Sequence, residues 1–192
     1  MNLHKVRLPL AHAKSSQLLI INVQEKLAKA MYTPHREQML ININRLSQAA
    51  QILEIPVVLS EHYAKGLGRT LPEITQHLAP EVDAKDKLAF SCCTAPGFEE
   101  ELERAEERKQ IIIVGLESHI CVLQTASGLQ QWGYQVFVVE DAIASRSSNN
   151  RRNAIERLRG GEVIISNAES VAYEWLSDAG HAHFKAVTQL FR

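Results

Sequence analysis

The feature that most constrains the fold is a series of short apolar runs, separated by longer stretches of helical periodicity. Five such runs occur, at residues 18–21, 55–59, 111–114, 136–139 and 163–165. Their hydrophobicity is continuous rather than alternating, which is typical of strands buried on both faces of a parallel sheet. A short apolar run alone is also compatible with a buried helix, so the intervals between the runs have to decide.

The intervals favour strands. Residues 34–53 and 118–132 place their apolar side chains at helical spacing between the runs. Strands that alternate with helices are the signature of an α/β fold, and right-handed crossovers place helices on both faces of the sheet. Residues 82–94 do not fit this alternation. We predict a short strand or an extended loop there, between helices around 71–77 and 97–108.

The length of 192 residues suits one domain, residues 1–192, with Met1 to about Ser16 as an N-terminal extension. The 21 Lys and Arg residues nearly balance the 22 Asp and Glu residues, for a formal charge of −1. This balance gives no electrostatic case for binding nucleic acid or an anionic membrane, and it leaves small molecules as expected partners.

The sequence also indicates a compartment. No apolar run reaches membrane-spanning length, and the first residues lack the apolar core of a signal peptide. The three cysteines are an odd number without the spacing of a disulfide framework. We therefore expect free thiols and a cytoplasmic protein.

Cys121 occupies a position where nucleophiles are often found. The run 111–114 ends at Gly115 and is followed by a helical pattern with a cysteine in its first turn. With Ser118 as N-cap, Cys121 falls at about N3, where the helix dipole can lower the thiol pKa from roughly 8.5 towards neutrality. The alternative is that Cys121 is a small buried apolar residue. Position alone leaves both open.

Polar residues follow the ends of the predicted strands. In open α/β sheets the ligand crevice lies beyond the carboxyl ends of the strands, so these residues are expected to share one rim. They are Asn22, Gln24, Glu61, His62, Glu117, Glu140, Asp141, Ser166 and Asn167.

Several of these segments together resemble one family, the isochorismatase-like cysteine hydrolases. The first three are the strand that ends at Asn22-Val-Gln24, the segment Lys87-Leu-Ala-Phe-Ser91 and the segment Gly115-Leu-Glu-Ser-His-Ile-Cys121-Val122. Residues 60–68, 141–147 and 154–158 resemble the isochorismatase domain-containing branch of that family. The resemblance covers roughly Gln17 to Leu190. Each motif is weak alone, and together they are specific for the superfamily, though not for a substrate.

The resemblance implies a three-layer α/β/α sandwich around a mostly parallel, Rossmann-like sheet of about six strands. It also implies a catalytic aspartate, lysine and cysteine, of which Cys121 matches the nucleophile and Lys87 the lysine. Asn22 stands where the family has aspartate. An amide cannot take up a proton as a carboxylate does, so the usual general-base route is affected. An engineered substitution that traps a ligand, a natural protein of low or no activity, and a rearranged site with another base all remain open.

Glu117 matches the residue whose backbone N–H, with that of Cys121, forms the oxyanion hole in this family. The resemblance implies a cis peptide bond between Leu116 and Glu117. Without the resemblance, Glu117 reads as an acid that favours the start of a helix. Without the resemblance, Lys87, which lies near Lys85, Asp83 and Asp86, would be interpreted as part of a solvated charged turn.

No metal and no other cofactor is expected. Nicotinamidase-like relatives bind a metal through an Asp-x-His pair, whereas Glu61-His62-Tyr63 supplies one histidine where three or four ligands are needed. No glycine-rich phosphate loop follows the first predicted strand either. Arg146 could bind an anionic substrate, bridge subunits or form a surface ion pair. The candidate substrate-binding residues, each of which could equally belong to the core, are Tyr63, Leu67, Phe90, His119 and Ile120.

The sequence therefore predicts a cysteine hydrolase that acts on a small amide, ester or enol-ether-type compound and is impaired by Asn22. The alternative is a catalytically inactive binding or scaffold protein that keeps the fold. Members of the family that the sequence resembles commonly form oligomers, and the apolar residues of 171–176 and 184–191 also favour a homo-oligomer.

Overall fold

The computed structural model describes residues 8–105 and 107–192 and contains one parallel sheet of six strands. The strands lie in the order β3-β2-β1-β4-β5-β6, and each pairs in parallel with its neighbour. Their bounds are β1 Ser16–Ile21, β2 Val57–His62, β3 Ala84–Lys87, β4 Gln110–Leu116, β5 Gln135–Ala144 and β6 Ile164–Ser166. This confirms the predicted α/β class and the number of strands.

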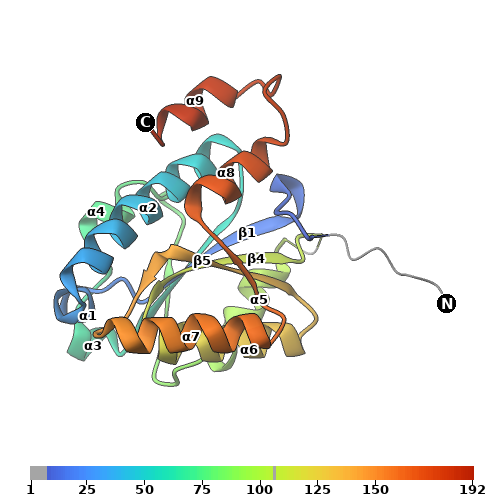
Figure 1. Ribbon diagram of the computed structural model, residues 1–192. Helices are drawn as coiled ribbons and strands as arrows, with labels where there is room; N and C mark the ends of the chain where they lie inside the picture. The colour runs from blue at the N-terminus through green and yellow to red at the C-terminus, as the bar shows by residue number, and fades with distance from the viewer. Residues whose placement is uncertain (1–7, 106) are drawn as a thin grey trace.

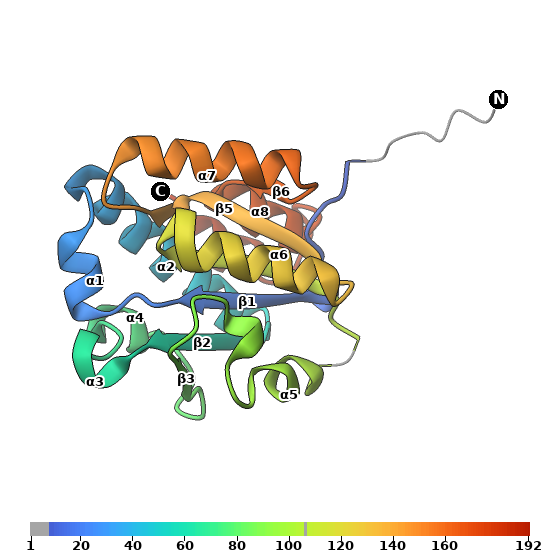
Figure 2. The same cartoon turned by 90° about the horizontal axis from the view of Figure 1, so that it is seen from below.

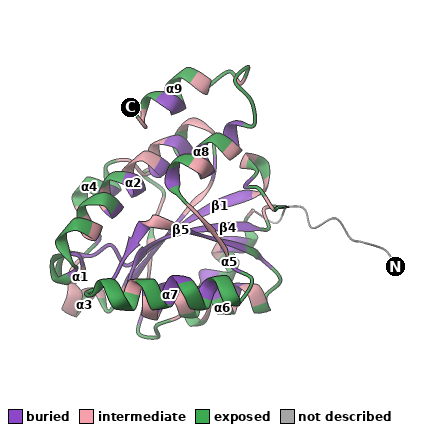
Figure 3. Ribbon diagram, in the orientation of Figure 1, coloured by how far each residue is buried: buried purple, intermediate pink, exposed green. Residues whose placement is uncertain are grey.

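The two central strands are buried along their whole length. Every residue of β1 and of β4 is buried, as the purple ribbons in Figure 3 show. Leu18 and Ile20 of β1 pack into one hydrophobic core, whereas Leu19 and Ile21 pack into another on the opposite face. Continuous hydrophobicity therefore reflects burial on both faces of the sheet.

Helices cover both faces and complete the three layers. Figures 1 and 2 show α2 and α8 on one side of the sheet and α6 and α7 on the other. The helices are α1 Glu25–Ala30, α2 Thr33–Ile52, α3 Ala64–Leu67, α4 Pro72–Thr75, α5 Phe98–Glu103, α6 Leu123–Gln131, α7 Ser148–Gly160, α8 Ala168–Leu176 and α9 Phe184–Gln189. None of the described helices is both long enough and apolar enough to cross a membrane.

One predicted element differs from the structure. The helix predicted for residues 118–132 is divided into a π-helical turn, Ser118–Val122, and α6. The segment 82–94, predicted as a short strand or an extended loop, contains the short strand β3 followed by a 3₁₀ turn at Cys92–Thr94.

The N-terminal extension is described only from residue 8, and its first seven residues lie outside the described part of the chain. The backbone N–H of Ala11 donates to Glu174 of α8 at 2.7 Å, and the Gln110 amide donates to the Leu10 carbonyl at 2.9 Å. These bonds fix the segment before β1 against α8 and the start of β4.

β1 and β4 are neighbours in the sheet although β2 and β3 separate them in the chain, so the strand order reverses between them. Ligands of open α/β sheets bind at such a reversal, beyond the carboxyl ends of the strands. At this end Gly115 opposes Ile21 and has a φ of 112°. A Cβ at Gly115 would lie 2.1 Å from the Ile21 carbonyl oxygen, so glycine allows the two strand ends to approach each other.

Candidate active site

The residues matched by the resemblance come from three strand ends and lie close together. Asn22 follows β1, Lys87 is the last residue of β3, and Cys121 lies in the π-helical turn after β4. The Lys87 ammonium lies 3.8 Å from the Cys121 sulfur, and Asn22 and Cys121 line the same pocket.

Asn22 is held in a fixed orientation. It has a φ of 51°, a left-handed conformation that asparagine tolerates better than most residues. The Ser60 hydroxyl donates to the Asn22 side-chain oxygen at 3.3 Å. The side chain is fully buried; its amide nitrogen makes no well-formed hydrogen bond among the described residues, but the side chain lies close enough to the Cys121 sulfur to stabilise the thiolate.

Lys87 is buried, with 3% of its surface exposed. Besides its contact with Cys121, its ammonium donates to the carbonyl oxygens of Ala89 at 3.1 Å and Phe90 at 2.9 Å. Lys85, two residues earlier, instead forms an ion pair with Glu101 at 2.9 Å. The two lysines therefore have different surroundings, and a solvated turn does not describe Lys87.

Cys121 is 5% exposed. Burial raises the pKa of its thiol above the ordinary value of 9.0; the Lys87 ammonium opposes the rise, Cys92 adds to it, and the Asn22 side chain lowers it. Of the two interpretations that the sequence left open, the direction of this shift favours the buried thiol, because desolvation exceeds the stabilisation of the thiolate. Ser118 is not an N-cap: its hydroxyl is buried without a hydrogen-bond partner among the described residues.

The peptide bond between Leu116 and Glu117 is cis. The Glu117 carboxylate accepts a hydrogen bond from the Arg146 guanidinium at 3.0 Å and another from the Arg146 backbone N–H at 3.3 Å. Arg146 therefore forms an ion pair at the rim, one of the three roles that its position allowed.

The pocket has a volume of about 370 Å³ and opens at the end of the sheet where the strand order reverses. Its apolar wall includes three of the predicted substrate-binding residues, Leu67, Phe90 and Ile120. The complete lining is Asn22, Lys26, Leu27, Ala30, Met31, His62, Leu67, Phe90, Glu117, Ile120, Cys121 and Arg146.

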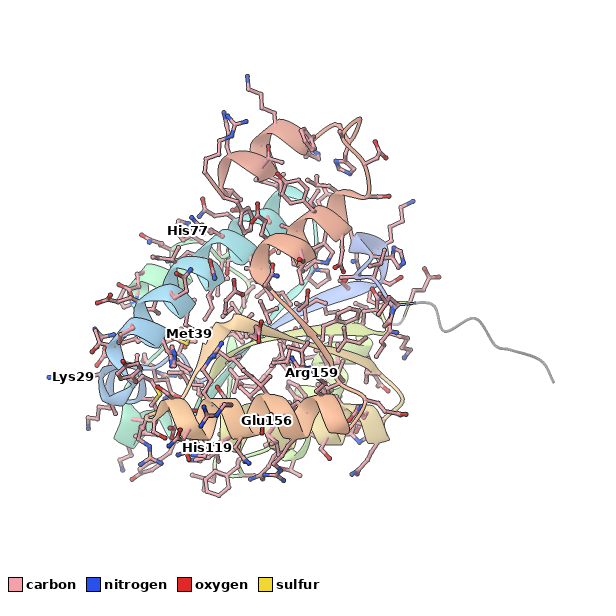
Figure 4. The ribbon with its side chains drawn as sticks, in the orientation of Figure 1. Lys29, Met39, His77, His119, Glu156 and Arg159 are labelled. Atoms are coloured by element: carbon pink, nitrogen blue, oxygen red, sulfur yellow. The ribbon has the colours of Figure 1, made fainter. Side chains whose placement is uncertain are left out.

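Tyr63 and His119, the other two predicted substrate-binding residues, lie outside this lining. Tyr63 has a left-handed backbone, is 48% exposed, and covers Gly66 with its ring. The His119 ring bonds to Ser145 at 3.0 Å and to the Asn150 amide at 3.3 Å, at the first turn of α7. Figure 4 shows His119 beside that end of the helix.

His62, which the sequence placed at the rim and considered as a possible metal ligand, lines the pocket. Burial and the Lys87 ammonium lower its pKa below the ordinary value of 6.5, so its imidazole is neutral at pH 7. Within the described residues, no group of three or more His, Cys, Asp or Glu side chains could hold a metal ion. The position of His62 at the end of β2 was the available signal for its place in the pocket.

These features define a class: α/β/α proteins in which a buried thiol and a buried ammonium meet at the reversal of strand order. The model of the isochorismatase domain matches residues 16–169. The chain belongs to the isochorismatase family.

Curated relatives and a solved structure agree with this assignment. The chain is 36% identical over 181 residues to the secreted isochorismatase effector Isc1 of Phytophthora sojae, covering 93% of this chain and 85% of that one. It is 34% identical to human isochorismatase domain-containing protein 2, covering 93% and 83% of the two chains. The MAR1 ribonuclease of Caenorhabditis elegans superposes with a TM-score of 0.88 at 34% identity, covering 95% and 92%.

Proposed function

We propose that this protein is a cysteine hydrolase that acts on a small amide, ester or enol-ether-type compound and is slowed by Asn22. The observation that carries the proposal is the 3.8 Å contact between the Lys87 ammonium and the Cys121 sulfur, beside a pocket of about 370 Å³. A thiol beside a cation and facing a pocket is a typical arrangement for nucleophilic catalysis.

For an amide or ester, the Cys121 sulfur attacks the carbonyl carbon and the carbonyl oxygen becomes an oxyanion. The backbone N–H groups of Glu117 and Cys121 are the proposed donors to that oxyanion. Collapse of the tetrahedral intermediate breaks the bond to the amine or alcohol, which leaves with a proton. Water then attacks the thioester, which releases the carboxylic acid and restores the thiol.

Proton transfer is the slow part of this scheme. The raised pKa of Cys121 means that the thiol has to lose a proton to react, and the Asn22 amide cannot accept it. His62 is a neutral lining residue that can act as an acceptor. Lys87 stabilises the thiolate once it forms.

Asn22 also supports a second candidate, a binding or scaffold protein without catalysis. A ribonuclease role, suggested by the name of the nematode neighbour, is disfavoured by the net charge of −1. We also propose a cytoplasmic homo-oligomer. The free cysteines among the described residues and the exposed apolar side chains of Leu88 and Phe90 support this proposal.

The test is to compare the wild type with Asn22→Asp against nicotinamide, small aliphatic and aromatic amides, and isochorismate. A carboxylate that restores the general base should raise kcat by about 100-fold or more on at least one compound. Cys121→Ser in either background should abolish turnover, and Asn153→Asp, a surface change of the same charge, should leave it unaltered. Turnover that survives Cys121→Ser would contradict the proposal, and absence of turnover in both the wild type and Asn22→Asp would favour the scaffold.

A further inference from the structure

Ser60 is a fully buried polar residue of β2 that the proposed mechanism does not use. It opposes Ile21 of β1, and the backbone N–H of Asn22 donates to the Ser60 carbonyl oxygen at 2.9 Å. The pairing of the two strands therefore holds the Ser60 side chain beside the Asn22 side chain. The Ser60 hydroxyl donates to the Asn22 side-chain oxygen at 3.3 Å.

The direction of that hydrogen bond follows from the second neighbour of the hydroxyl. The Cys92 thiol donates to the Ser60 hydroxyl oxygen at 3.3 Å. Cys92 is fully buried, and burial raises the pKa of its thiol, so the thiol keeps its proton at pH 7 and can donate. Sulfur is a weak acceptor, whereas an amide carbonyl oxygen is a better one. The Ser60 hydroxyl therefore accepts from Cys92 and directs its own proton at the oxygen of the Asn22 carboxamide.

The other end of the Asn22 carboxamide is a donor in need of an acceptor. Its NH₂ group is buried and makes no well-formed hydrogen bond within residues 8–105 and 107–192, which is rare for a buried donor. Asn22 and Cys121 line the same pocket. Burial has the largest effect on the pKa of the Cys121 thiol and raises it, whereas the Asn22 side chain lowers it, as a hydrogen bond to the thiolate does. The thiolate is therefore the acceptor that this NH₂ group lacks in the resting protein.

We infer that Ser60 is a positioning residue, whose hydroxyl holds the Asn22 carboxamide so that its NH₂ group faces the Cys121 sulfur and donates to the thiolate. The inference deepens the proposed function and rests on it in one respect, that the thiolate is the attacking nucleophile. Asn22 then stabilises the thiolate together with the Lys87 ammonium. A carboxamide turned the other way round would present its oxygen to the sulfur, and an acceptor cannot stabilise a thiolate.

The test is the pH dependence of Cys121 alkylation by iodoacetamide in the whole chain, from pH 7 to pH 10. Ser60→Ala should move the profile to higher pH and slow the reaction at pH 8.5 by about threefold, because the carboxamide is no longer held in one orientation. Ser60→Thr keeps the hydroxyl and should keep the wild-type profile. Asn22→Gly removes the carboxamide, and glycine tolerates the φ of 51° at this position. It should slow the reaction at pH 8.5 by about tenfold.

A double variant separates positioning from a general structural effect. Ser60→Ala should slow alkylation in the wild-type background but not in Asn22→Gly, since its effect passes through the Asn22 carboxamide. Ser47→Ala is the matched control and should leave the rate unchanged. Ser47 is also a fully buried serine, but its hydroxyl has no partner among the described residues.

An unchanged profile in Ser60→Ala would overturn the inference, and so would equal slowing by Ser60→Ala in the two backgrounds. Alkylation requires no turnover of a substrate. Absence of hydrolysis would therefore contradict the proposed function and leave the positioning role of Ser60 to be decided by the alkylation rates alone.

Discussion

At the residue scale, the protonation of the Cys121 thiol depends on the balance between its burial and the positive charge of Lys87. Burial raises the pKa of its thiol and the Lys87 ammonium lowers it, with burial the larger effect. Because the pKa of the Cys121 thiol is raised from 9.0, its thiolate fraction continues to increase as the pH rises above 9.0. Reactivity should therefore continue to increase where an ordinary thiol has reached its plateau.

We expect the rate of alkylation of Cys121 by iodoacetamide to rise about tenfold per pH unit from pH 7 to beyond pH 9. Lys87→Gln should raise the thiol pKa further, which lowers the thiolate fraction, and should slow the reaction at pH 8.5 by roughly tenfold. Mass spectrometry of tryptic peptides measures the rate, with Cys93, whose pKa burial raises to about 11, as internal reference. Lys87→Arg retains the charge and should react faster than Lys87→Gln. An unchanged rate in Lys87→Gln would show that the ammonium does not act on the sulfur.

Some residues of the site could be predicted from the sequence and others could not. Asn22, Lys87 and Cys121 could be named from motifs of the family. They were expected to lie close together because the strand ends of a parallel sheet meet at one edge. His62 could be placed at the rim because it ends β2, but its neutral state beside Lys87 and the Glu117–Arg146 pair could not be predicted. Both depend on side-chain directions beyond the strand ends, which no periodicity encodes.

At the scale of elements, the close approach of β1 and β4 positions the site. Gly115 permits this approach, and Asn22 follows Ile21 directly, so any side chain at position 115 would displace the strand end that carries the amide. The division of the helix after β4 into a π-helical turn and α6 was not predictable. The apolar pattern of residues 118–132 continues through both, so periodicity alone does not mark the boundary.

We expect Gly115→Ala to lower the free energy of unfolding by at least about 2 kcal/mol, measured by urea denaturation. Gly133→Ala is a matched control, because Gly133 also has a positive φ, of 83°, but nothing lies within 4 Å of a Cβ placed there. The difference between the variants isolates the clash with Ile21 from the cost of the backbone conformation. A smaller loss in Gly115→Ala than in Gly133→Ala would exclude a steric role for Gly115.

At the scale of the whole molecule, the site and the C-terminal helix lie in separate parts of the structure. Figure 1 shows α9 beyond α8, on the side of the helical layer away from the sheet. Val187 of α9 is buried, and the Arg45 guanidinium of α2 lies 5.4 Å from the centre of the Phe191 ring. The C-terminal segment therefore stabilises the helical layer without contributing to the pocket.

Deletion of residues 178–192 should lower the free energy of unfolding by about 3 kcal/mol, because it exposes apolar surface on α2 and α8. The rate of Cys121 alkylation in the folded protein should be unchanged. Val187→Ala is the milder companion variant and should lower stability by about 1–2 kcal/mol with the same unchanged rate. Loss of Cys121 reactivity in Val187→Ala, with its fold intact by circular dichroism, would contradict this separation.

The three-layer architecture was predictable because burial on both faces leaves continuous apolar runs, of which β1 and β4 are the clearest. The sequence does not decide between strand and loop for the edge strand β3. Three of the four residues of Ala84–Lys87 are charged and only Lys87 is buried, so the strand carries no apolar run.

The reversal of strand order has a consequence for the nascent chain. Asn22 and Lys87 are synthesised well before Cys121, yet β4 has to pair with β1 before the Cys121 sulfur can lie beside them. A ribosome-bound fragment that stops short of residue 110 would thus have no reactive centre. Reactivity of the thiol would therefore report the pairing of β4 with β1, which precedes the addition of β5 and β6 to the sheet.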